Sequence, residues 1–178
     1  MNTHDDSRHD LFFCEAQRFS VVIRLILPII VVISSGISII AVLDSMSKDT
    51  TSRPFIGAMA VSVLPIAIAV LLSAVKLETK VRADGLYVRL FPLHLRFRKF
   101  TAEQIKSHYP RQYRPLLEYG GWGIRYSLSG KSKAYNARGN LGVQLELAGG
   151  RKLLIGSQKP YELDNALSAM TQTPHNHT

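Results

Sequence analysis

The sequence predicts a two-helix transmembrane hairpin followed by a mostly antiparallel β domain of about seven strands with a C-terminal helix. Three observations predict this fold class: two long early segments lack charged residues, hydrophobic and polar residues then alternate, and the last apolar positions have helical spacing. The composition agrees, because 46% of the 178 residues are hydrophobic and many of these lie in the two early segments. We therefore do not expect a freely soluble single domain.

The two uncharged segments have the length of membrane spans. Residues 25–43 form the first and residues 55–75 the second, with 19 and 21 residues. A helix needs about 20 residues to cross a hydrocarbon core of about 30 Å. Neither segment has the polar face of a helix that lies on a membrane surface. With their flanks, they predict spans over residues 20–43 and 55–77.

A cleavable secretory signal is the alternative interpretation of the first segment. Its apolar region is too long for a signal, and no clean small-x-small cleavage site follows, because Ala41, Val42 and Leu43 lead into Asp44. A second apolar segment also follows closely. We expect both segments to be retained as a helical hairpin.

The basic residues around the two spans predict their orientation. Six of them flank the outer ends of the hairpin: Arg18, Arg24, Lys76, Lys80, Arg82 and Arg89. The segment between the spans has only Lys48 and Arg53. Because Lys and Arg concentrate on the cytoplasmic side, both termini are expected in the cytoplasm and the protein in the inner (plasma) membrane.

The interior of the spans favours packing over transport. Neither span contains an ionisable residue beyond the edge residues Arg24 and Lys76, and such residues usually mark ion or proton paths. Ser34 and Ser38 lie one helical turn apart, as do Ala58 and Ser62. Such small-residue faces allow close helix contact, within the hairpin or between two copies of the chain.

Four regions follow from these boundaries. Residues 1–19 form a polar cytoplasmic head, residues 20–77 the hairpin, residues 78–172 a cytoplasmic β domain and residues 173–178 a disordered tail. From Lys76 onward there are 17 Lys and Arg against 7 Asp and Glu, so the positive charge of the chain belongs to the β domain.

The first strands of the β domain follow from alternation and turn chemistry. Asp84-Gly85 separates two alternating segments, and this dipeptide is a strong hairpin signal. Leu93, Leu95 and Phe97 then alternate with basic residues and predict a third strand with one apolar and one basic face.

The later elements follow the same logic. Alternation predicts strands over residues 124–128, 133–137, 143–147 and 152–155, the last two joined by a turn at Gly149-Gly150. Ser157 and Pro160 are helix start signals, with Ser157 as a cap. The apolar positions of this terminal helix are spaced i, i+3, i+4 and i+7: Leu163, Ala166, Leu167 and Met170.

Several local sequences resemble those of bacterial membrane-anchored pleckstrin-homology-like (PH-like) proteins of uncharacterised function. They are Tyr-Gly-Gly-Trp-Gly-Ile-Arg at 119–125, Ala-Tyr-Asn at 134–136, Gly-Val-Gln-Leu-Glu-Leu at 142–147 and Leu-Ile-Gly-Ser at 154–157. The resemblance implies a PH-like curled sheet or barrel closed by the C-terminal helix, and a membrane location. It carries over no catalytic residue.

The Gly-Gly-Trp-Gly segment stands out because three glycines surround the only tryptophan. It matches neither of the common glycine-rich phosphate-binding patterns. One interpretation is a bulge or tight strand entry with Trp122 packed on the core. The other is a contact surface for a partner or lipid that includes Gly121, Trp122 and Arg125.

Basic residues of the β domain suggest a second surface. Arg96 and Arg98 are the candidates for contact with an anionic leaflet, where each cation contributes about 1 kcal/mol. The alternative is a solvated basic face. Nucleic acid is not expected as a partner, because the sequence lacks an aromatic-basic RNA motif.

No pattern in the sequence predicts catalysis, a cofactor or a metal site. Four of the six histidines lie near the termini, so a structured histidine site is not expected. The single cysteine, Cys14, forms no metal-binding spacing. We therefore expect no enzyme.

The sequence thus predicts a membrane protein that presents a PH-like domain at the cytoplasmic face as a binding or assembly module. Its expected partners are the bilayer and either another protein or a second copy of the chain. The alternatives are an anionic-lipid-binding domain and a small accessory subunit of a larger membrane complex.

Overall fold

The computed structural model describes residues 11–18, 21–127, 130 and 132–172 except 48–52. The predicted tail, most of the predicted head, Lys48 and Leu128 lie outside these residues. The chain forms two compact units: Phe19–Ala74 is one, and the flanking segments Met1–Arg18 and Val75–Thr178 together form the other.

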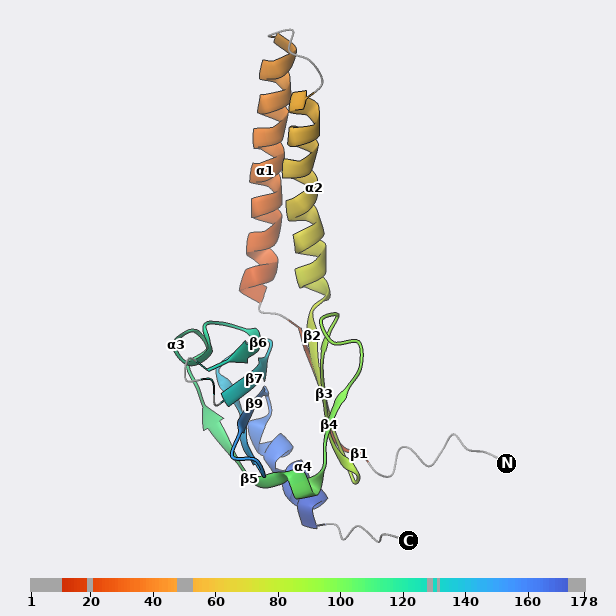
Figure 1. Cartoon of the computed structure of the whole chain (residues 1–178), viewed down its shortest axis with the longest axis vertical. Helices are drawn as coiled ribbons and strands as arrows, with labels where there is room; N and C mark the ends of the chain where they lie inside the picture. The colour runs from red at the N-terminus through yellow and green to blue at the C-terminus, as the bar shows by residue number, and fades with distance from the viewer. Residues whose placement is uncertain (1–10, 19–20, 48–52, 128–129, 131, 173–178) are drawn as a thin grey trace, which may run out of the picture. The chain divides into compact units, whose positions relative to one another are not determined.

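The first unit is a helical hairpin (Figure 1) of α1 (Val21–Ser47) and α2 (Arg53–Ala74). Within α1, Leu27 and Val31 are half-buried and Ser38 is buried, at spacings that place them on one face. The Ser38 hydroxyl donates a 2.9 Å hydrogen bond to the carbonyl of Ser34. Ser38, one of the predicted small residues, therefore packs inside the hairpin, while the side chains of Ala58 and Ser62 lie outside the described residues.

Length and composition support a membrane span for α1. Its segment Leu25–Asp44 is long and apolar enough to cross a membrane. Within the described residues no other helix passes this test, because the corresponding apolar segment of α2, Val63–Ala74, is shorter. The predicted end of the second helix at Leu77 is wrong. The helix ends at Ala74, and Leu77 is a buried strand residue.

Sheet A of the second unit has the order β1-β2-β3-β4 and is antiparallel throughout. Its strands are β1 (Leu11–Arg18), β2 (Lys76–Arg82), β3 (Gly85–Phe91) and β4 (Arg98–Phe100). The predicted hairpin at Asp84-Gly85 is confirmed, with Arg82 opposite Gly85. The strand β1 was not predicted from the sequence, and within it Phe13 is the only large apolar residue that is buried.

The predicted third strand at residues 93–97 is wrong. These residues form a loop, which we call the 92–97 loop, and β4 begins only at Arg98. Leu93 and Leu95 are 60% and 72% exposed instead of facing a core. These residues alternate as in a strand, but the Leu95 carbonyl accepts a hydrogen bond from the side chain of Arg89 on β3 instead of a backbone hydrogen bond of a ladder.

Sheet B has the order β5-β8-β9-β7-β6. Its strands in chain order are β5 (Ile105–Gln112), β6 (Gly123–Tyr126), β7 (Ser132–Asn136), β8 (Leu141–Leu147) and β9 (Lys152–Gly156). The predicted hairpin between β8 and β9 is confirmed, but β7 and β9 pair in parallel. Two short helices, η2 (Ala102–Gln104) and α3 (Pro115–Tyr119), flank β5.

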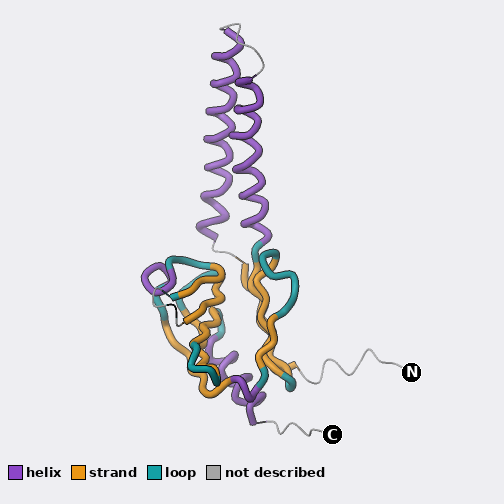
Figure 2. The backbone as a smooth tube through the Cα atoms, in the orientation of Figure 1, coloured by secondary structure: helices purple, strands orange, loops and turns teal. Residues whose placement is uncertain are grey.

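The two sheets, coloured as strands in Figure 2, remain separate, so the described strands form no closed barrel. The terminal helix α4 (Pro160–Gln172) contacts β1 and β2 of sheet A and β5 and β8 of sheet B. All four predicted apolar positions of α4 are buried. The helix thereby completes the core between the two sheets, because fully buried leucines come from both of them.

Candidate functional site

The structure places Gly121 and Trp122 in the turn between α3 and β6, and Arg125 on β6. The Trp122 indole Nε1 donates a 3.1 Å hydrogen bond to the carbonyl of Gly139. The Arg125 Nε donates to the Trp122 carbonyl at 3.2 Å. The Arg125 side chain therefore bonds back to the turn, and the indole of Trp122 links the turn to the segment after β7.

Backbone conformation explains the glycines of this turn. Gly120, Gly121 and Gly123 have φ angles of 67°, 127° and 114°, which residues with a Cβ rarely adopt. The amide of Gly123 also donates a 2.8 Å hydrogen bond to the Asn136 side chain. The glycines therefore allow the backbone conformation of the turn that leads into β6.

The two predicted arginines lie in different surroundings. Arg96 is exposed in the 92–97 loop. Arg98 is the first residue of β4 and lines a cavity of about 280 Å³ between sheet A and sheet B. Gly121, Trp122 and Arg125 do not line this cavity.

The cavity, which we call the cationic cavity, collects basic side chains from distant parts of the chain. Four of its lining residues are basic: Arg98, Lys133, Arg151 and Lys152. No lining residue is Asp or Glu among those the structure describes. Lys152 forms an ion pair of 3.0 Å with Glu146, which lies outside the lining. The other three have no carboxylate partner in the described part of the chain.

Tyrosines complete the wall of the cationic cavity. The Lys133 Nζ lies 4.9 Å from the ring centroid of Tyr135 and 5.2 Å from that of Tyr126. Tyr135 is fully buried, and its hydroxyl has no hydrogen-bond partner among the described residues. The His94 ring lies 5.8 Å from the Tyr135 ring. Burial lowers the pKa of His94, and the positive charges of Arg98 and Lys133 lower it further.

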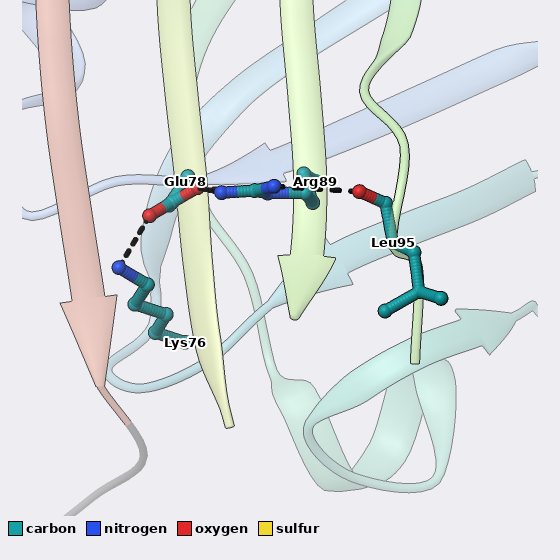
Figure 3. Close-up of polar contacts among 4 residues, drawn as sticks. All are labelled: Lys76, Glu78, Arg89 and Leu95. Atoms are coloured by element: carbon teal, nitrogen blue, oxygen red, sulfur yellow. Dashed lines mark hydrogen bonds and ion pairs between the residues drawn. The ribbon is translucent and has the colours of Figure 1, made fainter. Parts of the chain in front are cut away.

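The 92–97 loop is held against sheet A by Arg89 (Figure 3). The Arg89 Nε donates a 2.8 Å hydrogen bond to Glu78, and its Nη1 donates to the Leu95 carbonyl at 3.3 Å. The Arg89 guanidinium also lies over the Phe97 ring, 4.4 Å from its centroid. The loop therefore has a fixed inner side, while Leu93 and Leu95 extend outward.

Glu78 organises this contact from the neighbouring strand. Its carboxylate pairs with Arg89 and, at 2.5 Å, with the Lys76 ammonium. Burial alone would raise the pKa of Glu78, but the hydrogen bonds from Lys76 and Arg89 hold it below its ordinary value. The carboxylate is therefore ionised at neutral pH and neutralises Arg89 next to the loop.

Other polar pairs connect elements of the fold. His108 Nδ1 and Asp164 Oδ1 lie 2.6 Å apart and join β5 to α4. No cluster of three His, Cys, Asp or Glu side chains suited to a metal occurs within the described residues.

Sequence reasoning missed the cationic cavity because its basic residues are spread over three segments. The parallel pairing of β7 and β9 places Ser132 opposite Lys152 and Lys133 opposite Leu153. Alternation within each strand gave no indication of this pairing. The sequence does indicate Arg98 as a candidate, but for contact with a membrane.

Comparison with known proteins identifies a family whose function is unknown. The model of a family described as a family of unknown function (DUF6141) matches residues 11–173. The match begins at the first residue of β1 and extends to the end of α4, so it covers both units. No curated protein matches the chain.

Proposed function

We propose that this chain, which belongs to the DUF6141 family of unknown function, is an integral protein of a bacterial inner membrane whose two-sheet domain is a non-catalytic binding or assembly module at the cytoplasmic face. In this proposal the domain is PH-like in plan, since two sheets contact one C-terminal helix. The parallel pair of β7 and β9 departs from a fully antiparallel plan.

The pairing of β1 with β2 carries the proposal of two spans. Arg18, at the end of β1, lies opposite Lys76, at the start of β2. The chain enters α1 three residues after Arg18 and leaves α2 two residues before Lys76. This pairing supports the proposal that both ends of the hairpin lie on one side of the membrane, so that a chain that crosses through α1 returns through α2. With 22 residues, α2 is about 33 Å long, enough to cross the core.

The outer surface of the hairpin is apolar, which supports the proposal that it contacts lipid. In the described part of α1 and α2, 16 large aliphatic side chains are 44–70% exposed. Each gains on the order of 1 kcal/mol when the rest of its surface leaves water. A continuous apolar surface of this kind marks an interaction with membrane or protein.

The single cysteine tests the topology directly. Cys14 is exposed on β1 and is the only cysteine of the chain. A membrane-impermeant maleimide should label it only after cells are lysed. In a Cys14→Ser background, Thr50→Cys in the segment between the helices should be labelled in intact cells. Labelling of Cys14 in intact cells, or release of the protein by alkaline carbonate, would contradict the proposal.

The 92–97 loop favours a second candidate function, contact with anionic lipid headgroups. Phe91 lies opposite Lys76, so the loop begins at the end of sheet A from which the chain continues to the helices. Leu93 and Leu95 are exposed there beside the positive charge of Arg96. Apolar tips next to cations suit the boundary between headgroups and hydrocarbon.

A fluorescent probe on the loop tests this second function. An environment-sensitive fluorophore on Leu95→Cys, in a Cys14→Ser background of the full chain in nanodiscs, should shift to shorter wavelength when anionic lipid is present. The matched control is Tyr161→Cys on α4, because Tyr161 is as exposed as Leu95, at 73% against 72%. Equal emission from both positions would reject lipid contact through the loop.

A further inference from the structure

We infer that the cationic cavity between β4 and the β6, β7 and β9 strands binds the phosphate group of a small phosphomonoester. This inference is independent of the membrane topology, because the lining residues all belong to the sheet domain. Four observations carry it: the charge of the lining, the buried hydroxyl of Tyr135, the mixed polar and apolar wall, and the size of the cavity.

The charge of the lining favours an anion. Arg98, Lys133 and Arg151 line one cavity and have no carboxylate partner among the described residues. Like charges at short range repel one another, most strongly where the site is partly shielded from water. The lowered pKa of His94 follows partly from the same charges of Arg98 and Lys133. A bound dianion would neutralise this excess.

The hydroxyl of Tyr135 supplies a neutral donor. Tyr135 lines the cavity, is fully buried, and has no hydrogen-bond partner for its hydroxyl in the described part of the chain. Buried polar groups in native proteins are nearly always paired. An anionic oxygen in the cavity accepts the hydrogen bond that the phenol otherwise lacks.

The donor set fits phosphate. Two guanidinium groups and two ammonium groups line the cavity, and guanidinium forks bind phosphate oxygens in pairs. A phosphomonoester offers three acceptor oxygens and close to two negative charges, so it can engage several of these groups at once.

The walls and the volume describe the rest of the ligand. Phe100, Tyr126, Leu147 and Leu153 give one side of the cavity an apolar surface. Its volume of about 280 Å³ lies near the lower limit of small-molecule sites. The ligand therefore has a compact apolar or aromatic body, and its phosphate comes from a soluble ester or from a lipid headgroup.

Calorimetric titration of the full chain in detergent micelles with phenyl phosphate tests the inference. We expect one molecule bound per chain, with affinity weakened about tenfold or more by Arg98→Gln or Lys133→Gln, as for loss of a charge-assisted hydrogen bond. Tyr135→Phe should also weaken binding while circular dichroism stays unchanged. Lys106→Gln on β5, at the opposite edge of sheet B, removes the same charge and should leave binding intact.

A parallel titration with short-chain phosphatidic acid distinguishes the two phosphate sources. Equal or tighter binding of phenyl phosphate identifies a soluble ester, and clearly tighter binding of phosphatidic acid identifies a lipid headgroup. In both cases Arg98→Gln must weaken binding. The inference is overturned if neither compound binds, or if Lys106→Gln weakens binding as much as Arg98→Gln does.

Discussion

The Ser157 hydroxyl donates a 2.6 Å hydrogen bond to the carboxylate of Glu15, across 142 residues of sequence. The amide of Gln158 donates to the other Glu15 oxygen at 2.9 Å. The Ser157 oxygen also accepts from the Lys159 amide at 3.0 Å. Lys159 precedes the first residue of α4, so this bond does not confirm the predicted role of Ser157 as a helix cap. One carboxylate thus ties the edge strand of sheet A to the segment that joins sheet B to α4.

Removal of this carboxylate should destabilise the domain. Glu15→Ala leaves the buried Ser157 hydroxyl without its acceptor, so we expect the free energy of unfolding to fall by about 1–3 kcal/mol. Chemical denaturation of the full chain in detergent measures the change. A double-mutant cycle with Ser157→Ala should show coupling. Glu162→Ala, which removes an exposed carboxylate paired with Lys159, is the control and should change stability by less than about 0.5 kcal/mol.

Glu78 should make the domain sensitive to acid. Because the pKa of Glu78 is lowered in the folded protein, its ion pairs stabilise the fold at pH values above the ordinary pKa of 4.5. This contribution is lost as the pH falls through the lowered value. Glu78→Gln should therefore reduce stability at pH 7 and make its decline toward acid pH shallower. Equal acid dependence of the variant and the parent would contradict this account.

Tyr113 should make the stability of the domain depend on pH in the alkaline range. Burial raises the pKa of Tyr113 from 10.0 to about 12. The contribution of Tyr113 to the free energy of unfolding is fully present below pH 10. It is lost between pH 10 and about 12, because the tyrosine ionises there only in the unfolded state. The loss amounts to about 3 kcal/mol. Tyr113→Phe should remove this part of the alkaline destabilisation. Absorbance titration should also show that a late-ionising tyrosine of the parent protein is missing from the variant.

Gly142 marks a close approach of two strands. A Cβ on Gly142 would lie 2.4 Å from the carbonyl oxygen of Ile155 on β9, a backbone atom that cannot move without disturbing the ladder. Gly142→Ala should therefore cost about 1–3 kcal/mol, as overpacking does. Gly149→Ala is the matched control, since its Cβ would meet nothing closer than the Arg151 Nε at 3.9 Å. Thermal unfolding in detergent compares the two, and equal melting temperatures would exclude the contact as the reason for glycine.

Sequence patterns predicted the elements that depend on residues close to one another in the sequence. The spacing of the apolar residues gave all four buried positions of α4, and turn chemistry gave the hairpins at Gly85 and Gly150. The Gly-Gly-Trp-Gly segment was also recognised as unusual. Its role in the turn before β6 became clear only with the hydrogen bond from Trp122 to Gly139.

Sequence patterns gave the wrong structure, or none, for segments whose structure depends on contact with a distant segment. The alternation at Leu93 and Leu95 resembled a strand, but these residues lie in the 92–97 loop and Arg89 takes the Leu95 carbonyl. In β1, Phe13 gave too weak a signal, and the strand forms because β2 is available to pair with it. Both outcomes depend on hydrogen bonds between segments that the sequence does not show as neighbours.

The sequence by itself determined the apolar character of the helical hairpin, the basic charge of the sheet domain and the amphipathic face of α4, because hydrophobicity and charge are properties of each residue and its neighbours. Tertiary structure alone decided that Arg18 lies opposite Lys76, that β7 and β9 run in parallel, and that Arg98 and Lys133 share a cavity. These relationships arise when distant segments exchange water for each other's hydrogen-bonding groups and apolar surface, and no local pattern encodes which segments will meet.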